Sequence, residues 1–206
     1  TKELVAALRA ELSASALAER RVALAKKIAD LQANRLNDSE GASETLEEIL
    51  RLRPLDQDAW RRLRDLHVQA NDYANLTKSY EREARHAPSV KRQESCFRAA
   101  AQICEHHLND KARAAELYQE VLVRGDPECL AVKVLPGLLK DLGDEDAYER
   151  ALRRTPEIVP RTRLAAKALL TLGRRLAKRN EPAAAVRDLE SALDQDPDCV
   201  PALDLL

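Results

Sequence analysis

Three neighbouring residues have side chains that could bind a metal. Cys104, His106 and His107 include the two residue types that zinc most often uses. On a helix only Cys104 and His107 share a face, because they are three residues apart. They therefore supply at most two ligands, whereas a structural zinc site needs about four. The sequence predicts no metal and no other cofactor.

A second set of residues could bind a partner instead. Within about 60° of helical projection lie four cations, Arg163, Lys167, Arg174 and Lys178. Arginine forks pair well with carboxylates, so this basic stripe could dock an acidic segment of another protein. A solvated helix face gives the same pattern in a chain that is 33% charged. Both interpretations stay open.

Catalytic motifs are missing from the chain. Its five glycines form no phosphate-binding loop, and neither GxSxG nor HExxH occurs. No pair of carboxylates stands out from the general surface charge. The sequence predicts that this chain is not an enzyme. The alternative is a regulatory region of a larger enzyme whose catalytic domain lies elsewhere.

Composition indicates a folded helical protein. The 206 residues include 34 basic and 35 acidic ones, for a net charge of -1, and aromatic residues make up 3%. Neutral charge and few aromatics argue against a nucleic-acid partner, although a helical solenoid that binds nucleic acid is the alternative function. No apolar run reaches the roughly 20 residues of a membrane span, and no signal peptide opens the chain. We expect a cytoplasmic protein without membrane insertion.

The elements that must position these residues are written in repeats. The phrase RLNDSEGASETLEEILRLRP near residue 35 returns as HLNDKARAAELYQEVLVRGDP at 107–127 and as KRNEPAAAVRDLESALDQDP at 178–197. Each phrase places Asn and an acidic residue before an Ala-rich helix, where both types are good N-caps. A proline follows each helix and favours its end. The repeat unit is a helix, a tight turn, a second helix and a stop.

The period of one unit carries a family resemblance. Pro88 follows Pro54 by 34 residues, and between them Trp60 and Leu63 form a W-x2-L opening. Leu172 and Gly173 in the last hairpin match the neighbouring part of the same signature. This pattern resembles the tetratricopeptide repeat (TPR) family over most of the chain, and in particular the tandem arrays of large bacterial proteins of the myxobacterial type. Departures from it are Arg64, His67 and Leu76.

The resemblance implies an all-α fold: a right-handed α-solenoid of about five TPR-like hairpins, expected to be a fragment of a longer array. We expect a second helix at 1–12, hairpins at 13–54, 55–88, 89–127, 128–156 and 157–197, and the start of another helix at 198–206. Pro136-Gly137 falls inside the fourth hairpin, where an interior proline disrupts a helix. A local bend and a late helix start are both open.

The resemblance also implies a function. TPR arrays are protein-interaction scaffolds or adaptors that hold a partner peptide, helix or domain on their concave face, in motility, polarity or secretion assemblies among others. The partner would be a protein, such as an acidic segment or, in a polarity system, a small GTPase. We also expect that the chain could self-associate through its terminal helices, which belong to incomplete repeats. Beside the basic stripe, the partner-binding candidates are Lys27, Asn34, Arg61, Asp65 and His107.

Overall fold

A computed structural model describes residues 1–125 and 130–206, which form two compact units, Thr1–Leu108 and Asn109–Leu206. Every regular element in these ranges is helical and none is a strand. The all-α fold of successive helical hairpins is therefore confirmed. The expected hairpin end at Pro127 lies outside the described residues. The expected continuity and right-handed twist of one array across both units stay predictions.

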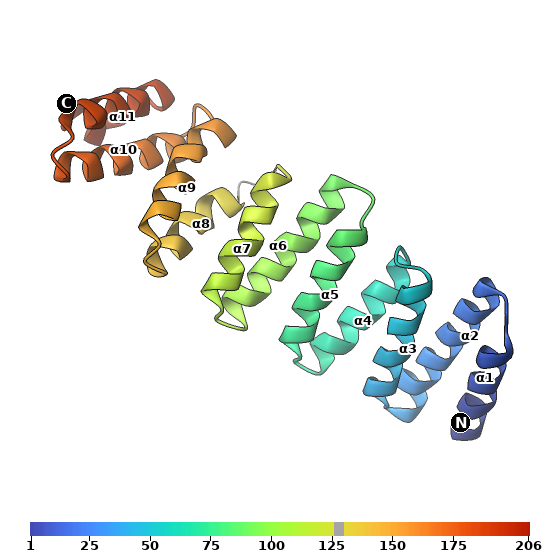
Figure 1. Ribbon diagram of the computed structural model, residues 1–206. Helices are drawn as coiled ribbons and strands as arrows, with labels where there is room; N and C mark the ends of the chain where they lie inside the picture. The colour runs from blue at the N-terminus through green and yellow to red at the C-terminus, as the bar shows by residue number, and fades with distance from the viewer. Residues whose placement is uncertain (126–129) are drawn as a thin grey trace. The chain divides into compact units, whose positions relative to one another are not determined.

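The first unit consists of helices that stand side by side in chain order (Figure 1). Each helix packs against the next one along the chain. Trp60 and Leu63 lie fully inside the core, and the Trp60 indole donates a hydrogen bond to the Pro54 carbonyl at 2.8 Å. The helices are α1 (Lys2–Ala14), α2 (Ala18–Leu31), η1 (Gln32–Leu36), α3 (Ser39–Leu52), α4 (Gln57–Gln69), α5 (Tyr73–His86) and α6 (Val90–His106).

The second unit repeats this arrangement. Helix α8 packs on α7 and α9, and α10 packs on α9 and α11. Gly173 of α10 faces α11 so closely that an added Cβ would lie 2.9 Å from the Leu189 side chain, which explains why a glycine occupies this position. The helices are α7 (Lys111–Val123), α8 (Leu130–Asp141), α9 (Glu145–Ile158), α10 (Arg163–Lys178), α11 (Pro182–Gln195) and the short α12 (Val200–Leu203).

Short turns join the helices within hairpins, and the last two residues of each turn have different roles. The asparagines adopt the left-handed conformation, with φ of 50° at Asn37 and 53° at Asn71, and so end the first helix. The aspartate that follows caps the second helix: the side chain of Asp72 accepts a hydrogen bond from the Asn75 N–H at 3.0 Å, whereas Glu181 before α11 makes no such bond. The expectation that both residues act as N-caps is thus corrected.

The same turn occurs once more, at Gly143-Asp144, where the sequence analysis found no repeat phrase. Gly143 has φ of 73°, and the Asp144 side chain accepts from the Ala147 N–H at 2.9 Å. The left-handed residues of these hairpin turns fall at 37, 71, 109, 143 and 180, and Arg161, before α10, is left-handed outside them. The spacing of the turn residues alternates between short and long units more regularly than the spacing of the prolines.

Two prolines lie inside helices, contrary to expectation. Helix α9 continues through Pro156 to Ile158, so the hairpin end expected at Pro156 lies later. Helix α8 begins at Leu130 and runs through Pro136, so it neither breaks nor starts late there. A proline removes one backbone hydrogen bond, which packing against neighbouring helices offsets in both cases. Helix α1 also extends two residues beyond the expected boundary at residue 12, to Ala14.

The first hairpin contains an irregularity that the sequence did not predict. Helix α2 ends at Leu31 and continues as the π-helical turn η1, which takes up an extra residue before the turn. Gln32 is buried there and accepts a hydrogen bond from the Thr45 hydroxyl at 2.7 Å. The π turn places Asn34 on the same side of the hairpin as α4.

Candidate protein-binding clefts

Clefts recur in both units by the same construction. Within each unit, a helix packs against the ones before and after it, so two alternate helices form walls above the helix between them. We call α2, α4, α6, α8 and α10 the first helices, and α1, α3, α5, α7, α9 and α11 the second helices, of their hairpins. Clefts walled by first helices and clefts walled by second helices open on different faces of a unit.

The α2–α3–α4 cleft brings together three of the residues expected from sequence. Asn34 of η1 and Arg61 and Asp65 of α4 line a cavity of about 320 Å³. Ala42 and Leu46 of α3 form its floor. This is the cleft that the resemblance predicts on the first-helix face.

Ion pairs neutralise most of the charge around this cleft. Arg62 pairs with Asp30 across the cleft and with Asp58 on its own helix at 3.0 Å. Arg61 also pairs with Asp58, at 2.9 Å. Although burial acts in the opposite direction, the hydrogen bonds from Arg61 and Arg62 hold the pKa of Asp58 below its usual value. Few of its charges are left for a ligand.

The α4–α5–α6 position is occupied by the chain's own side chains. Glu83 of α5 is 1% exposed and pairs with Arg64 of α4 and, at 2.5 Å, with Arg92 of α6. The Arg64 guanidinium lies 4.8 Å above the Tyr80 ring. This explains the departure of Arg64 from the small residue of the family pattern, because the arginine neutralises a carboxylate that the next helix buries. Burial next to Glu83 also raises the pKa of the Cys96 thiol to about 11.

The α8–α9–α10 cleft differs from both. It has a volume of about 240 Å³, and its floor is formed by Tyr148 and Leu152 of α9. Three lysines line it, Lys133 and Lys140 from α8 and Lys167 from α10. Among the residues that the structure describes, no acidic side chain lines this cleft.

The three lysines have no ion-pair partner among the described residues. Asp141 follows Lys140 directly, but it pairs with Lys111 of α7 at 2.6 Å, and that contact lowers the pKa of Asp141. The lysine ammonium groups are strongly hydrated and remain available to an incoming carboxylate. The cleft therefore combines apolar surface with unpaired positive charge.

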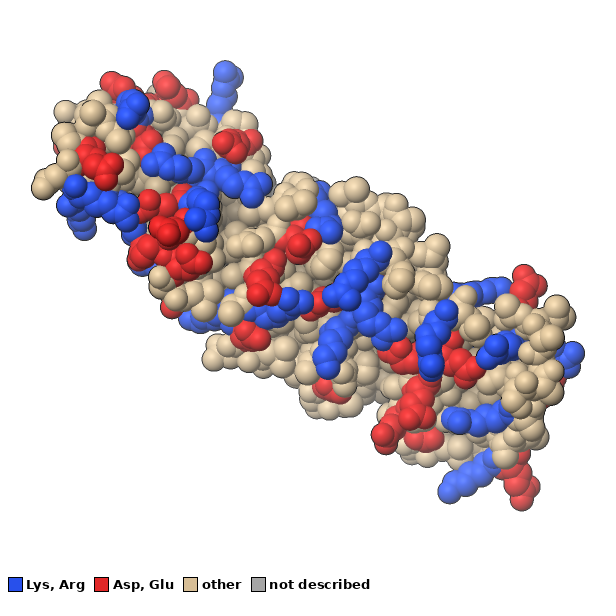
Figure 2. All heavy atoms as spheres, viewed as in Figure 1, with Lys and Arg blue, Asp and Glu red and all other residues tan. Residues whose placement is uncertain are grey.

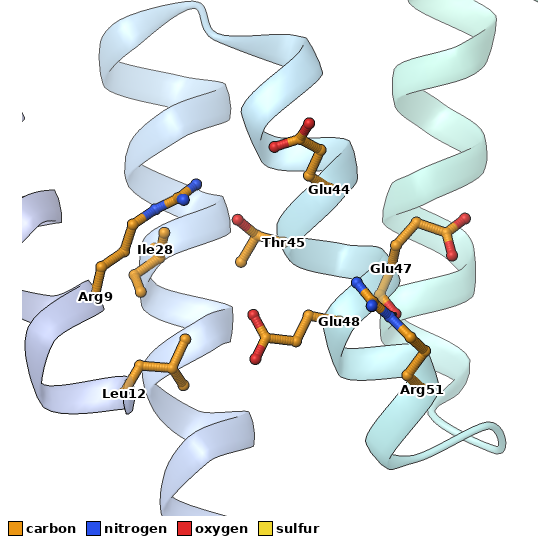
Figure 3. A pocket seen from close by; sticks show the side chains of 8 residues that line it. All are labelled: Arg9, Leu12, Ile28, Glu44, Thr45, Glu47, Glu48 and Arg51. Carbon is orange, nitrogen blue, oxygen red and sulfur yellow. The ribbon is translucent and has the colours of Figure 1, made fainter. Parts of the chain in front are cut away.

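On the second-helix face of the first unit, the α1–α2–α3 cleft has a volume of about 380 Å³. Figure 3 shows Arg9 of α1 and Glu44 of α3 on opposite walls, above Ile28 of α2. Its charges have both signs. Glu48 pairs with Arg21 at 3.1 Å and Glu47 with Arg82 at 2.5 Å, so this cleft shows no preference for one sign of ligand.

The remaining predicted residues lie apart from these clefts. Lys27 is exposed on α2, and the His107 ring stacks on Tyr73 with ring centroids 4.0 Å apart. Arg174 and Lys178 are exposed on α10, as is Arg163, which lies 3.8 Å from Asp196. Of the basic stripe, Lys167 lines one of the clefts given above for the described residues, and the other three side chains line none of these clefts.

Sequence reasoning missed Lys133 and Lys140. The signal was present, since these lysines and Pro136-Gly137 occupy positions i, i+3, i+4 and i+7 and so share one helix face. The interior proline directed attention to a helix break instead of to that face.

The described residues form neither a metal site nor a membrane-spanning helix. No group of three or more His, Cys, Asp or Glu residues within the described ranges could hold a metal ion. None of the described helices has the length and apolarity to cross a bilayer. On the face drawn in Figure 2, acidic and basic side chains are interspersed.

Comparison with known proteins gives structural likeness only. No protein-family model matches the chain, and no curated protein matches it. Among solved structures, YrrB, described as a TPR protein with an unusual peptide-binding site, is 19% identical, with coverage of 88% of this chain and 89% of that one and a TM-score of 0.41. A MamA structure is 15% identical, with coverage of 87% and 93% and a TM-score of 0.44. The TPR2AB domain of yeast Sti1 in complex with pHSP90 is 16% identical, with coverage of 89% and 81% and a TM-score of 0.38.

Proposed function

We propose that this chain is a TPR-like protein-interaction scaffold that binds an acidic segment of a partner protein in the α8–α9–α10 cleft. The observation that carries the proposal is the set of unpaired lysines, Lys133, Lys140 and Lys167, around an apolar floor. A partner with carboxylates beside an apolar anchor residue complements both features. We assign this segment no catalytic role, and we expect its partner to be a protein rather than a nucleic acid.

The two features contribute differently to binding. Burying one leucine-sized anchor on Tyr148 and Leu152 supplies about 1.5–3 kcal/mol. An exposed lysine–carboxylate pair supplies about 0.2–1 kcal/mol. The floor therefore provides most of the affinity. The lysines select acidic partners, orient them and speed association.

Nucleic acid is the competing occupant of a cationic cleft. An RNA ligand needs aromatic surfaces for stacked bases and a continuous run of positive charge along its backbone. Tyr148 is the aromatic residue in this cleft, and on the face drawn in Figure 2 acidic side chains lie among the basic ones. A protein partner fits these features better. That the chain acts in a motility, polarity or secretion assembly stays a prediction. The same holds for a small GTPase as its partner and for a cytoplasmic location.

Affinity capture from the source cells with zero-length crosslinking tests the proposal, because this chemistry joins lysines directly to carboxylates. We expect crosslinks from Lys133, Lys140 or Lys167 to Asp or Glu of one partner protein. Recovery of that partner should fall at least about tenfold in Lys133→Glu/Lys140→Glu, because like charges then face each other.

The matched control is Lys2→Glu/Lys91→Glu, which changes the net charge equally at two exposed lysines of the first unit. It should recover the partner as well as the unmodified chain does. Equal losses in both variants, or crosslinks only to nucleic-acid-binding proteins released by nuclease, would contradict the proposal. The predicted stripe is tested by Arg174→Glu/Lys178→Glu, for which we expect a smaller loss because these side chains do not line the cleft.

A further inference from the structure

The second-helix face of the second unit carries another cleft with unpaired positive charge. Helices α7 and α9 form its walls and α8 its floor, around a volume of about 360 Å³. Leu135 and Leu139 of α8 lie at the bottom, and Leu122 and Val123 of α7 continue the apolar surface along one wall. The Val123 side chain is 73% exposed, the highest value among the large exposed apolar residues of the described chain.

Arginines line the opposite wall. Arg150 and Arg154 of α9 are exposed, line the cleft and have no ion-pair partner among the described residues. Glu120, the one acid that lines the cleft within the described ranges, already pairs with Arg124 at 2.5 Å. The cleft therefore offers two free guanidinium groups above an apolar floor.

The spacing of the arginines indicates the form of the partner. Arg150 and Arg154 are one helical turn apart, a rise of about 6 Å. Carboxylates at positions i and i+4 of a helix have the same spacing and can meet both guanidinium groups when that helix lies alongside α9. Apolar residues on the adjoining face of the same helix would then contact Val123 and Leu139.

We propose that the α7–α8–α9 cleft is a second docking site, and that it binds an acidic amphipathic helix of a partner protein. The second unit then holds two acidic segments at once, one on each face, and bridges them. Helices α8 and α9 separate the two sites: Lys133 and Lys140 point to one cleft and Leu135 and Leu139 to the other. This proposal concerns a different surface from the proposed function and can fail independently of it.

The experiment is a titration of the intact isotope-labelled chain with a defined probe, followed by amide NMR. The probe is a helical peptide of about 16 residues with glutamates at i and i+4 beside a stripe of leucines. A peptide with glutamine in place of each glutamate is the ligand control. We expect shifts at Leu122, Val123 and Ala151 in addition to shifts around the lysine cleft, with two peptides bound per chain.

Each pair of charge reversals serves as the control for the other. In Arg150→Glu/Arg154→Glu the affinity at the α7–α8–α9 cleft should fall at least about tenfold while shifts at the lysine cleft persist. In Lys133→Glu/Lys140→Glu the opposite should hold. The exposed Val123→Ser variant should weaken only the α7–α8–α9 site, by a smaller factor, without unfolding the chain.

Several outcomes would overturn this second site. Shifts confined to the lysine cleft, or equal weakening of both sites by either double variant, would show that the arginines contribute only long-range charge. Equal affinities for the glutamine peptide and the glutamate peptide would show that the α7–α8–α9 cleft does not select an acidic partner. Loss of the lysine-cleft shifts alone would overturn the proposed function and leave the second site standing.

Discussion

The α2–α3–α4 and α8–α9–α10 clefts are built alike and differ in charge. In the first, Arg62 joins Asp30 and Asp58, so cations and carboxylates neutralise one another at the rim. In the second, Lys133, Lys140 and Lys167 have no such partner among the described residues. The same helix arrangement thus provides a cleft of this kind in each unit. Side-chain pairing decides which of them retains charge for a ligand.

Between α4 and α6 the chain goes further and buries the charges. Arg64 and Arg92 both bind Glu83, which stands in the core where the equivalent residues of α3 and α7, Ile49 and Val121, are apolar. A buried carboxylate is tolerated only when hydrogen-bonded cations compensate its lost hydration. On the first-helix faces, the α4–α5–α6 position is therefore filled by side chains, the α2–α3–α4 cleft is neutralised by ion pairs, and the α8–α9–α10 cleft is open.

The largest expected effect on stability comes from removing an arginine from the filled α4–α5–α6 position. Arg64→Met leaves Glu83 with one of its two arginine partners, and the free energy of unfolding should fall by about 3 kcal/mol. Urea titration followed by fluorescence measures it, because Trp60 is the single tryptophan and lies in the same unit. The double variant Arg64→Met/Glu83→Leu should recover most of the loss. A change below about 0.5 kcal/mol in the single variant would mean that the pair is not structurally important.

An intermediate effect of opposite signs is expected at two helical glycines of the second unit. Gly173→Ala should destabilise it by about 1–3 kcal/mol, because the added Cβ would lie 2.9 Å from Leu189 Cγ and 3.2 Å from the Ala185 carbonyl oxygen. Gly137→Ala should stabilise it by about 1 kcal/mol, because nothing lies within 4 Å and alanine favours the helix.

Thermal unfolding monitored by circular dichroism compares these two glycine variants. Gly137 lines the open cleft, so its alanine variant also tests whether a methyl group there lowers partner affinity. Shifts of the same sign in both variants would show that α8 and α10 do not differ in packing as the structure has it.

The smallest effect tests the rim charges directly. Arg62→Ala removes two ion pairs from a side chain that is 34% exposed and should cost about 0.5–1 kcal/mol of unfolding free energy. Lys140→Ala removes no ion pair, so its free energy of unfolding should stay within about 0.5 kcal/mol of that of the unmodified chain. Urea titration of the two variants side by side gives the difference. An equal cost in both would remove the distinction between the neutralised and the open cleft.

How far sequence reasoning reached is clearest at the turns and at α8. The Asn-Asp pairs identified the hairpins, because a left-handed residue followed by a capping acid is a local requirement of backbone geometry. Gly143-Asp144 meets the same requirement with glycine in place of asparagine, so it does not match the repeated sequence phrase. Pro136 suggested a broken helix, whereas α8 runs through it because packing against α7 and α9 outweighs one missing hydrogen bond.

The family resemblance suggested Asn34, Arg61 and Asp65 for one inner face, and their role in binding stays a prediction. The sequence by itself determined the all-α class and the hairpin order. These follow from periodicity and capping, which act over a few residues. Only the tertiary structure decided which charges remain unpaired, because an ion pair such as Arg62–Asp30 joins positions 32 residues apart. Whether a cation is free depends on what the neighbouring helix places opposite it, and no local pattern contains that information.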